Sequence, residues 1–399
     1  MRDLTEASIL RVLRSLLAQE LAQGHGRRPD AAAAAAWPDD LSLGADGLGL
    51  DSLELLGCGA AVNGFFRLHE SGVEDYLLAE RSLDRWARII RAGLADGTTG
   101  LTFATSGSSG APKPCFHPHA SLLQEAGHWA GVFADRGRVI QCVPAHHIYG
   151  FLFTVLLPQR LGIPVVDARG RAAGPRRRLL RPDDLVVGFP AGWPALLAGV
   201  EALPPGIRLA SSTAPLPAAM HRALRAAGAA EVTEIYGSSE TAGIASRCHP
   251  DSPFTLLPHW QPGASGEHAS LRDSLTGEET PLPDHATWTE AGRLRLLGRK
   301  DQAVQVGGIN VFPEQVAARL GRHALVRACA VRLDAALPVP RLKAFVVLRE
   351  GAQPGAAAEL DRWCRQEFSA AERPVRLDIG ASLPVGVLGK AADWSIPAA

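Results

Sequence analysis

The sequence lacks a surplus of charge of either sign. Its 399 residues include 41 lysines and arginines and 41 aspartates and glutamates, so the formal net charge at pH 7 is zero. Proteins whose main partner is a nucleic acid or an anionic membrane surface usually carry a basic surplus on the surface that binds it. The charge balance argues against both kinds of partner, and we expect no nucleic acid.

The sequence also lacks paired cysteines and long apolar runs. Its six cysteines form neither CxxC pairs nor the spacing of a disulfide framework. The first residues lead directly into an amphipathic pattern instead of the apolar core of a signal peptide, and no apolar run is long enough to span a membrane. We therefore predict a reduced, soluble, cytoplasmic protein without membrane insertion, with room for two or three domains.

Residues 1–96 are predicted to form a separate helical segment. Apolar residues from Ile9 to Leu21 recur at helical spacing, and further helical runs extend to Phe66 and to Ile90. The second long run begins within the sequence Gly-Leu-Asp-Ser-Leu, which contains Ser52. An aspartate or a serine at this place also serves as a helix cap, because either side chain accepts hydrogen bonds from free backbone N–H groups.

This segment resembles an acyl carrier protein, in which a serine carries the flexible, thiol-ended phosphopantetheine arm. The resemblance implies that Ser52 is a possible attachment site. Two alternatives remain open: a working carrier domain, or a relic that covers apolar core where a lobe is missing. We favour the relic, because a segment that covers exposed apolar core cannot also move as a carrier domain must.

A loop rich in serine and glycine follows the apolar run of residues 101–104. Its candidate phosphate-binding residues are Thr105, Ser106, Gly107, Ser108, Ser109, Gly110 and Lys113. Glycines allow successive backbone N–H groups to converge on phosphate oxygens, and a lysine adds positive charge. The spacing differs from that of the ordinary P-loop, and the loop alone is equally consistent with a solvated linker.

From about residue 97 onward, predicted strands alternate with predicted helices, which indicates a parallel, doubly wound sheet. The predicted strands include residues 139–144, 185–188, 208–211 and 232–235, and each runs into a turn. Sheets of this kind bind ligands in the loops at the carboxyl ends of their strands. We therefore expect the site at that edge.

Six motifs follow in the order that they have in the adenylate-forming superfamily. They are residues 105–113, His147 within residues 144–150, and residues 211–216, 236–240, 298–301 and 383–390. From about residue 100 to residue 395 the chain therefore resembles this superfamily, which contains acyl- and aryl-CoA synthetases, peptide-synthetase adenylation domains and luciferases. One such motif is a weak signal, but six in order are a strong one.

The resemblance implies an α/β multidomain fold. Residues 1–96 would be the helical carrier-like segment, 97–300 the AMP-binding adenylation core, and 301–399 a small mobile α+β domain. Family members usually have a longer stretch before the phosphate loop. We therefore expect a truncated large domain, in which the helical segment stands in for part of a lobe.

The resemblance also implies a reaction that uses ATP and Mg²⁺. A carboxylic acid becomes an acyl-adenylate with release of pyrophosphate, and a thiol then displaces AMP. Lys390 would neutralise charge at the α-phosphate, Ser239 would bond that phosphate, and Glu240 would hold the metal ion. His147 would lie beside the acyl pocket, and Asp301 would be the hinge of the small domain.

A nucleotide-binding set completes what the resemblance implies. Besides the loop residues named above, it comprises Ser212, Thr213, Ala214, Pro215, Tyr236, Asp284 and Arg299. Tyr236 would lie against the adenine, whereas Asp284 and Arg299 would bond the ribose. Each residue taken singly has an ordinary structural explanation, so the interpretation depends on their order along the chain.

Besides the short stretch before the phosphate loop, two further departures from the family pattern bear on the substrate and the thiol acceptor. In the first, Gln305 replaces a usual lysine and Pro114 replaces a glycine, and in the second, the residues after Lys390 lack the usual basic side chain. Because CoA needs basic contacts, we predict transfer to the phosphopantetheine thiol of an acyl carrier protein. The alternatives are a CoA ligase similar to 4-coumarate–CoA ligase and a non-catalytic adenylate-binding protein. The run His-Ile-Tyr-Gly-Phe resembles the aryl-ligase version of its motif, which implies an aryl acid, such as a hydroxybenzoate, as the small carboxylic acid substrate.

Overall fold

The computed structural model describes most of the chain. The described residues are 1, 3–24, 29–105, 113–171, 179–198, 202–266, 268–274, 276–299, 303–334, 337–349, 355–384 and 394. They belong to two units, one built mainly from residues 1–282 and 286–296 and the other mainly from residues 283–285 and 297 onward. Each unit is described by itself below.

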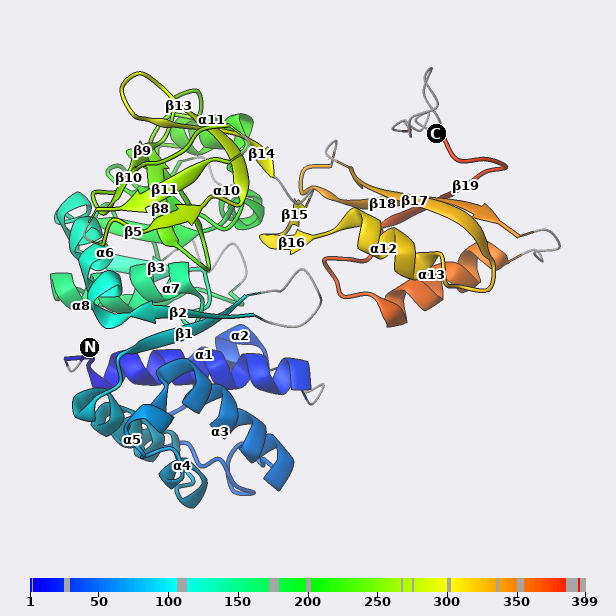
Figure 1. Ribbon diagram of the computed structural model, residues 1–399. Helices are drawn as coiled ribbons and strands as arrows, with labels where there is room; N and C mark the ends of the chain where they lie inside the picture. The colour runs from blue at the N-terminus through cyan, green and yellow to red at the C-terminus, as the bar shows by residue number, and fades with distance from the viewer. Residues whose placement is uncertain are drawn as a thin grey trace. The chain divides into compact units, whose positions relative to one another are not determined.

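Helices dominate the first ninety-six residues (Figure 1). They are α1 (Glu6–Gly24), α2 (Ala31–Ala35), α3 (Ser52–Phe66), the 3₁₀ turn η1 (Leu68–Glu70), α4 (Tyr76–Ala79) and α5 (Leu83–Asp96). The three predicted helical runs are α1, α3 and α5. None of the described helices is long and apolar enough to cross a membrane.

A capping box begins α3. The Asp51 carboxylate accepts hydrogen bonds from the backbone N–H groups of Leu53 and Glu54, both at 2.8 Å. The Glu54 carboxylate in turn accepts the Asp51 N–H at 3.1 Å. Asp51 is therefore the N-cap. Ser52 is the first helical residue, and its side chain is exposed.

The N-terminal helices share one apolar core with the elements that follow them. Phe65 of α3 meets Phe103 of β1 (Gly100–Thr105) edge-on, with ring centroids 5.0 Å apart. The same ring lies 5.9 Å from that of Phe151 in α7 (Ile148–Phe151). The domain boundary at residues 96 and 97, the carrier-like origin and the shortened lobe stay predictions. In the structure, residues on both sides of that boundary pack together.

A seven-stranded sheet forms the centre of the first unit, in the order β4-β3-β5-β6-β7-β8-β9. Its strands are β3 (Arg138–Gln141), β4 (Val165–Asp167), β5 (Asp184–Gly188), β6 (Arg208–Ser211), β7 (Glu231–Ser238), β8 (Ala242–Arg247) and β9 (Thr255–Leu256). The strands from β4 to β7 run parallel, and β8 and β9 are antiparallel additions. The predicted α/β class and the predicted parallel strands are confirmed.

Shorter elements surround this sheet. They are the hairpin strand β2 (Lys113–Pro118), α6 (His119–Val132), the π-helical turn η2 (Leu152–Leu156), α8 (Leu157–Leu161), η3 (Pro190–Gly192), α10 (Trp193–Leu197) and α11 (Ala218–Ala226). Strands β10 (Trp260–Pro262), β11 (Ser270–Asp273) and β12 (Glu279–Pro281) form an antiparallel sheet, and β13 (Asp284–Trp288) pairs with β14 (Leu294–Arg299).

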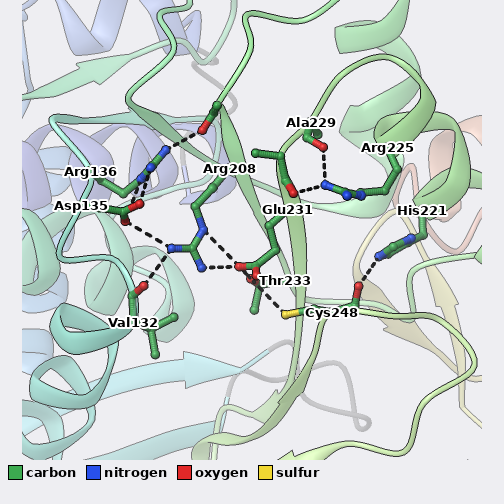
Figure 2. Close-up of polar contacts among 12 residues, drawn as sticks. Val132, Asp135, Arg136, Arg208, His221, Arg225, Ala229, Glu231, Thr233 and Cys248 are labelled. Atoms are coloured by element: carbon green, nitrogen blue, oxygen red, sulfur yellow. Dashed lines mark hydrogen bonds and ion pairs between the residues drawn. The ribbon is translucent and has the colours of Figure 1, made fainter.

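Ion pairs tie the amino ends of the parallel strands together. Arg138 and Asp184 are register partners in β3 and β5, and Arg138 donates two hydrogen bonds to the buried carboxylate at 2.8 and 2.9 Å. Arg208 of β6 pairs in the same way with Glu231 of β7, and it also contacts Asp135 (Figure 2). These contacts join neighbouring strands at the amino edge of the sheet.

The second unit is an α+β structure with its own apolar core. Its elements are β15 (Val304–Val306), β16 (Ile309–Val311), α12 (Pro313–Leu320), β17 (Val326–Asp334), β18 (Arg341–Leu348), α13 (Ala356–Glu367) and β19 (Arg376–Ile379). Strands β17 and β18 are antiparallel, whereas β19 pairs parallel to β18. Trp394 packs on this sheet, where its carbonyl accepts from Lys343 Nζ at 2.8 Å and its indole N–H donates to Asp378 at 2.9 Å.

Candidate active site

The turn after β6 lies at the carboxyl edge of the sheet, as predicted. Ser212 is buried, and its hydroxyl donates to the carbonyl of Ile235 in the neighbouring strand β7 at 2.9 Å. Thr213 adopts the left-handed conformation with φ of 77°, and its side chain is exposed. A threonine in this conformation is strained, and such residues concentrate at ligand-binding turns. Ala214 and Pro215 follow it, half-buried and exposed.

The end of β7 carries the predicted aromatic and carboxylate residues. Tyr236 is half-buried, with its ring 5.9 Å from that of Phe254. The ladder between β7 and β8 shifts register between Tyr236 and Gly237. A β-carbon on Gly237 would lie 2.2 Å from the Ala242 carbonyl oxygen, so only glycine fits there.

A short turn connects β7 to β8 and presents Glu240. Ser238 and Thr241 close this turn, since their hydroxyl oxygens are 3.0 Å apart and the Thr241 N–H donates to the Ser238 hydroxyl at 3.2 Å. Glu240 is exposed. Such a carboxylate fits Mg²⁺, which binds through one or two carboxylates together with substrate phosphates.

The predicted phosphate loop joins the two strands of a hairpin. Strands β1 and β2 are antiparallel, with Thr105 paired to Lys113 at the base of the loop. Lys113 is exposed. The predicted phosphate-binding residues Ser106, Gly107, Ser108, Ser109 and Gly110 lie outside the described residues.

The hairpin contacts the β7–β8 turn through His117. This histidine is buried on β2, and its Nε2 lies 2.7 Å from the carbonyl oxygen of Ser239. Burial, followed by the nearby Glu240 carboxylate, raises the pKa of Cys115 to about 11, so this thiol stays protonated at neutral pH. No local sequence pattern signals the contact between His117 and Ser239, because these residues are 122 positions apart.

Glu125 is a second buried residue that the sequence pattern did not reveal. It lies on α6, where its carboxylate accepts from Trp129 Nε1 at 2.9 Å and from the Gly243 backbone N–H at 3.0 Å. The Gly243 carbonyl accepts from Trp260 Nε1 at 2.9 Å. Gly243 follows the Glu240 turn, so Glu125 holds the start of β8 in place.

Glu125 should make the stability of the protein depend on pH. Burial raises its pKa from 4.5 to about 7 in the folded state. Between these values the folded protein holds a proton that the unfolded chain has released, so the free energy of unfolding falls as pH rises. The full difference is about 3 kcal/mol.

Urea unfolding of the protein and of Glu125→Gln at pH 5 and pH 8 measures this effect. The variant should be less stable at pH 5, because an amide offers one acceptor oxygen to two donors, but it should lose less stability between the two pH values. Equal losses in the two proteins would contradict the prediction.

The two neighbouring histidines after β3 differ in exposure. His146 is buried, with Nδ1 2.8 Å from the Ser15 hydroxyl and Nε2 bonded to Gln19, both on α1. His147, the predicted pocket residue, is exposed, and its ring lies 4.5 Å from that of His146. Helix α1 therefore orients the segment that presents His147.

The remaining predicted residues are spread over the rest of the chain. Asp284 is buried at the start of β13, and Arg299 is the last residue of β14. Asp301 and Lys390 lie outside the described residues. No group of three or more His, Cys, Asp or Glu side chains in the described part of the chain is arranged to hold a metal ion.

Comparison with known proteins decides the family. Residues 98–296 match the model of the AMP-binding enzyme family. A 4-coumarate–CoA ligase of Halorhodospira halophila is 41% identical over 393 residues, which cover 98% of this chain and 100% of that protein. The chain belongs to the AMP-binding enzyme family. This chain is also 39% identical over 398 residues to a 4-coumarate–CoA ligase of Rhodobacter capsulatus. The match covers 97% of this chain and 100% of that protein.

Solved structures agree on the fold of the ligase. An o-succinylbenzoate–CoA synthetase of Bacillus subtilis aligns with a TM-score of 0.60 at 17% identity, covering 96% of this chain and 91% of that one. An amide bond synthetase of Marinactinospora thermotolerans aligns with a TM-score of 0.59 at 18% identity, covering 96% and 92%. The predicted resemblance to the superfamily is confirmed. The protein is an AMP-forming acid–thiol ligase, and the non-catalytic alternative is set aside.

Proposed function

We propose that the ligase activates an aryl acid of the 4-coumarate type with ATP and transfers it to CoA. The observation that carries this proposal is the near full-length identity of 41% to a protein named 4-coumarate–CoA ligase. Two further proteins of that name are 39% and 40% identical over 97% and 90% of this chain. This evidence favours the CoA-ligase alternative over the carrier-protein acceptor that the sequence departures had suggested.

The proposed reaction has two balanced steps. In the first, a carboxylate oxygen of the acid forms a bond to the α-phosphorus of ATP, and the bond from that phosphorus to pyrophosphate breaks. In the second, the CoA thiolate forms a bond to the acyl carbon, and AMP leaves with the electron pair of the broken C–O bond. Both steps depend mainly on positioning and on stabilising negative charge.

The described residues are suited to the first step. Ser239 and Glu240 stand at the carboxyl edge of the sheet, next to the strand that carries Tyr236. We assign the α-phosphate to Ser239, Mg²⁺ to Glu240 and the adenine to Tyr236. When bound, Mg²⁺ would neutralise charge on the phosphates. The hairpin base at Thr105 and Lys113 would direct its loop to the β- and γ-phosphates.

Other assignments concern the acid, the ribose and the motion of the enzyme. We propose that His147 lies beside the acyl pocket, and that Asp284 and Arg299 bond the ribose. Asp301 is proposed as the hinge about which the second unit turns between the two steps. The N-terminal helices would replace part of the usual first lobe, since they share one apolar core with the rest of the first unit.

The acid and the acceptor are tested together. Purified ligase with MgATP should release pyrophosphate with 4-coumarate at least tenfold faster than with a long-chain fatty acid, because an aryl pocket loses contacts with a flexible chain. Addition of CoA should give the CoA thioester. Hydroxybenzoates, assayed in the same way, test the substrate that the sequence motif had suggested. Pyrophosphate release without thioester in the presence of CoA would contradict the proposed acceptor.

Ser52 provides the internal control for the carrier alternative. The hydroxyl is exposed, but the opposite face of α3 buries Leu55, Cys58 and Val62 in the shared core. We therefore propose that this helix stays in place and that Ser52 is not modified. Incubation with CoA and a phosphopantetheinyl transferase should leave the intact mass unchanged. A gain of one phosphopantetheine that Ser52→Ala loses would restore the carrier alternative.

A further inference from the structure

The backbone carbonyl of Ser239 lies between two predicted ligand-binding residues. It belongs to the peptide group that joins Ser239 to Glu240. Because this group is planar, the direction of the carbonyl sets the direction in which the chain enters Glu240. A contact that holds the carbonyl therefore also influences where the Glu240 carboxylate is placed.

His117 makes that contact. Its Nε2 lies 2.7 Å from the Ser239 oxygen. A carbonyl oxygen only accepts hydrogen bonds, so Nε2 must carry the hydrogen. The ring is 6% exposed and lies edge-on to Phe103, with centroids 5.7 Å apart. Packing of this kind restricts the direction of the donated hydrogen bond.

The turn itself is under conformational constraint. Ala242 has φ of 57°, which is uncommon for a residue with a side chain, and the β7–β8 ladder is irregular at Gly237. Glu125 holds the far end of the turn through the Gly243 N–H. His117 holds the near side, so the turn is supported from both sides by the stretch that follows the phosphate loop.

We propose that His117 is a positioning residue for MgATP, which couples strand β2 to the Ser239–Glu240 peptide. Strand β2 begins at Lys113, four residues before His117. One strand thus carries Lys113 and the histidine that contacts the peptide of the proposed Mg²⁺ ligand. This inference rests on the proposed function for the role of Glu240.

The test compares His117→Leu with His117→Gln. Leucine fills similar volume without a donor and leaves the half-buried Ser239 carbonyl without this hydrogen bond, so the Kd and KM for MgATP should rise about tenfold. The KM for the acid should change less than twofold. Glutamine offers an N–H at similar reach and should restore most of the MgATP affinity.

His221→Leu is the matched control. His221 is 4% exposed on α11, and its Nε2 donates to the Cys248 carbonyl at 2.9 Å (Figure 2). Cys248 directly follows β8, at the end of that strand away from the turn. This variant should lose comparable thermal stability without a change in MgATP affinity.

Three outcomes would overturn the inference. They are an unchanged MgATP Kd in His117→Leu, an equal rise in His221→Leu, or no recovery in His117→Gln. Measuring the Kd by calorimetry without acid or CoA keeps this test independent of the proposed substrate and acceptor. Glu240→Gln, titrated with Mg²⁺, tests the metal assignment separately.

Discussion

Replacing Lys390 with alanine is expected to slow acyl-adenylate formation by about a hundredfold or more. The proposed first step gathers negative charge around the α-phosphorus and the attacking carboxylate. An ammonium group in a site that excludes water stabilises this charge when it develops. The variant should keep its fold, because the proposed role of the lysine is to stabilise charge that develops only during the reaction.

Pyrophosphate release from ATP and 4-coumarate measures the effect. The second half-reaction, started from synthetic acyl-adenylate and CoA, should proceed at nearly the original rate and serves as the internal control. Lys390→Arg keeps the charge with a different geometry, so its rate of pyrophosphate release should lie between those of the original protein and Lys390→Ala. A folded Lys390→Ala variant with near-normal pyrophosphate release would remove Lys390 from the site.

Replacing Asp184 with alanine is expected to lower the free energy of unfolding by about 3–5 kcal/mol. The carboxylate is fully buried and accepts two hydrogen bonds from Arg138 and one from the Arg181 N–H at 2.7 Å. Without it, the Arg138 guanidinium remains buried without its charge partner. An unpaired buried charge costs far more than an intact pair contributes.

Asp135→Ala is the matched control, measured by urea unfolding alongside Asp184→Ala. Asp135 also pairs with arginines at this edge of the sheet, but its side chain is 60% exposed (Figure 2). Its loss should cost less than about 1 kcal/mol. The double variant Asp184→Leu with Arg138→Met should be more stable than Asp184→Ala. A similar loss in Asp184→Ala and Asp135→Ala would show that burial does not decide the effect.

Local patterns in the sequence predicted the elements and the family. The alternation of apolar strands with helices predicted the parallel sheet, because each strand needs cover on both faces. The order of the six motifs predicted an adenylate-forming ligase, because the same motifs follow in that order in the superfamily that the chain resembles. Asp51 and Ser52 were both suitable caps, and only the capping box with Glu54 decided between them.

The thiol acceptor is the point on which the motifs and the relatives favour different proposals. Departures at Pro114 and Gln305 suggested a carrier protein, but the relatives that match nearly the whole chain are named as CoA ligases. Single substitutions at motif edges change few contacts, whereas similarity over the full length reflects the whole site. The matches to these relatives also cover nearly the whole chain, N-terminal helices included.

By itself, the sequence determined the elements and the family, because these depend on periodicity and on motif order. Tertiary structure alone decided what supports them. His117 reaches Ser239 across 122 positions, Glu125 reaches Gly243 across 118, and Ser15 reaches His146 across 131. Such contacts arise where distant segments pack, and no local pattern of apolar and polar residues encodes which distant partner a buried polar group will find.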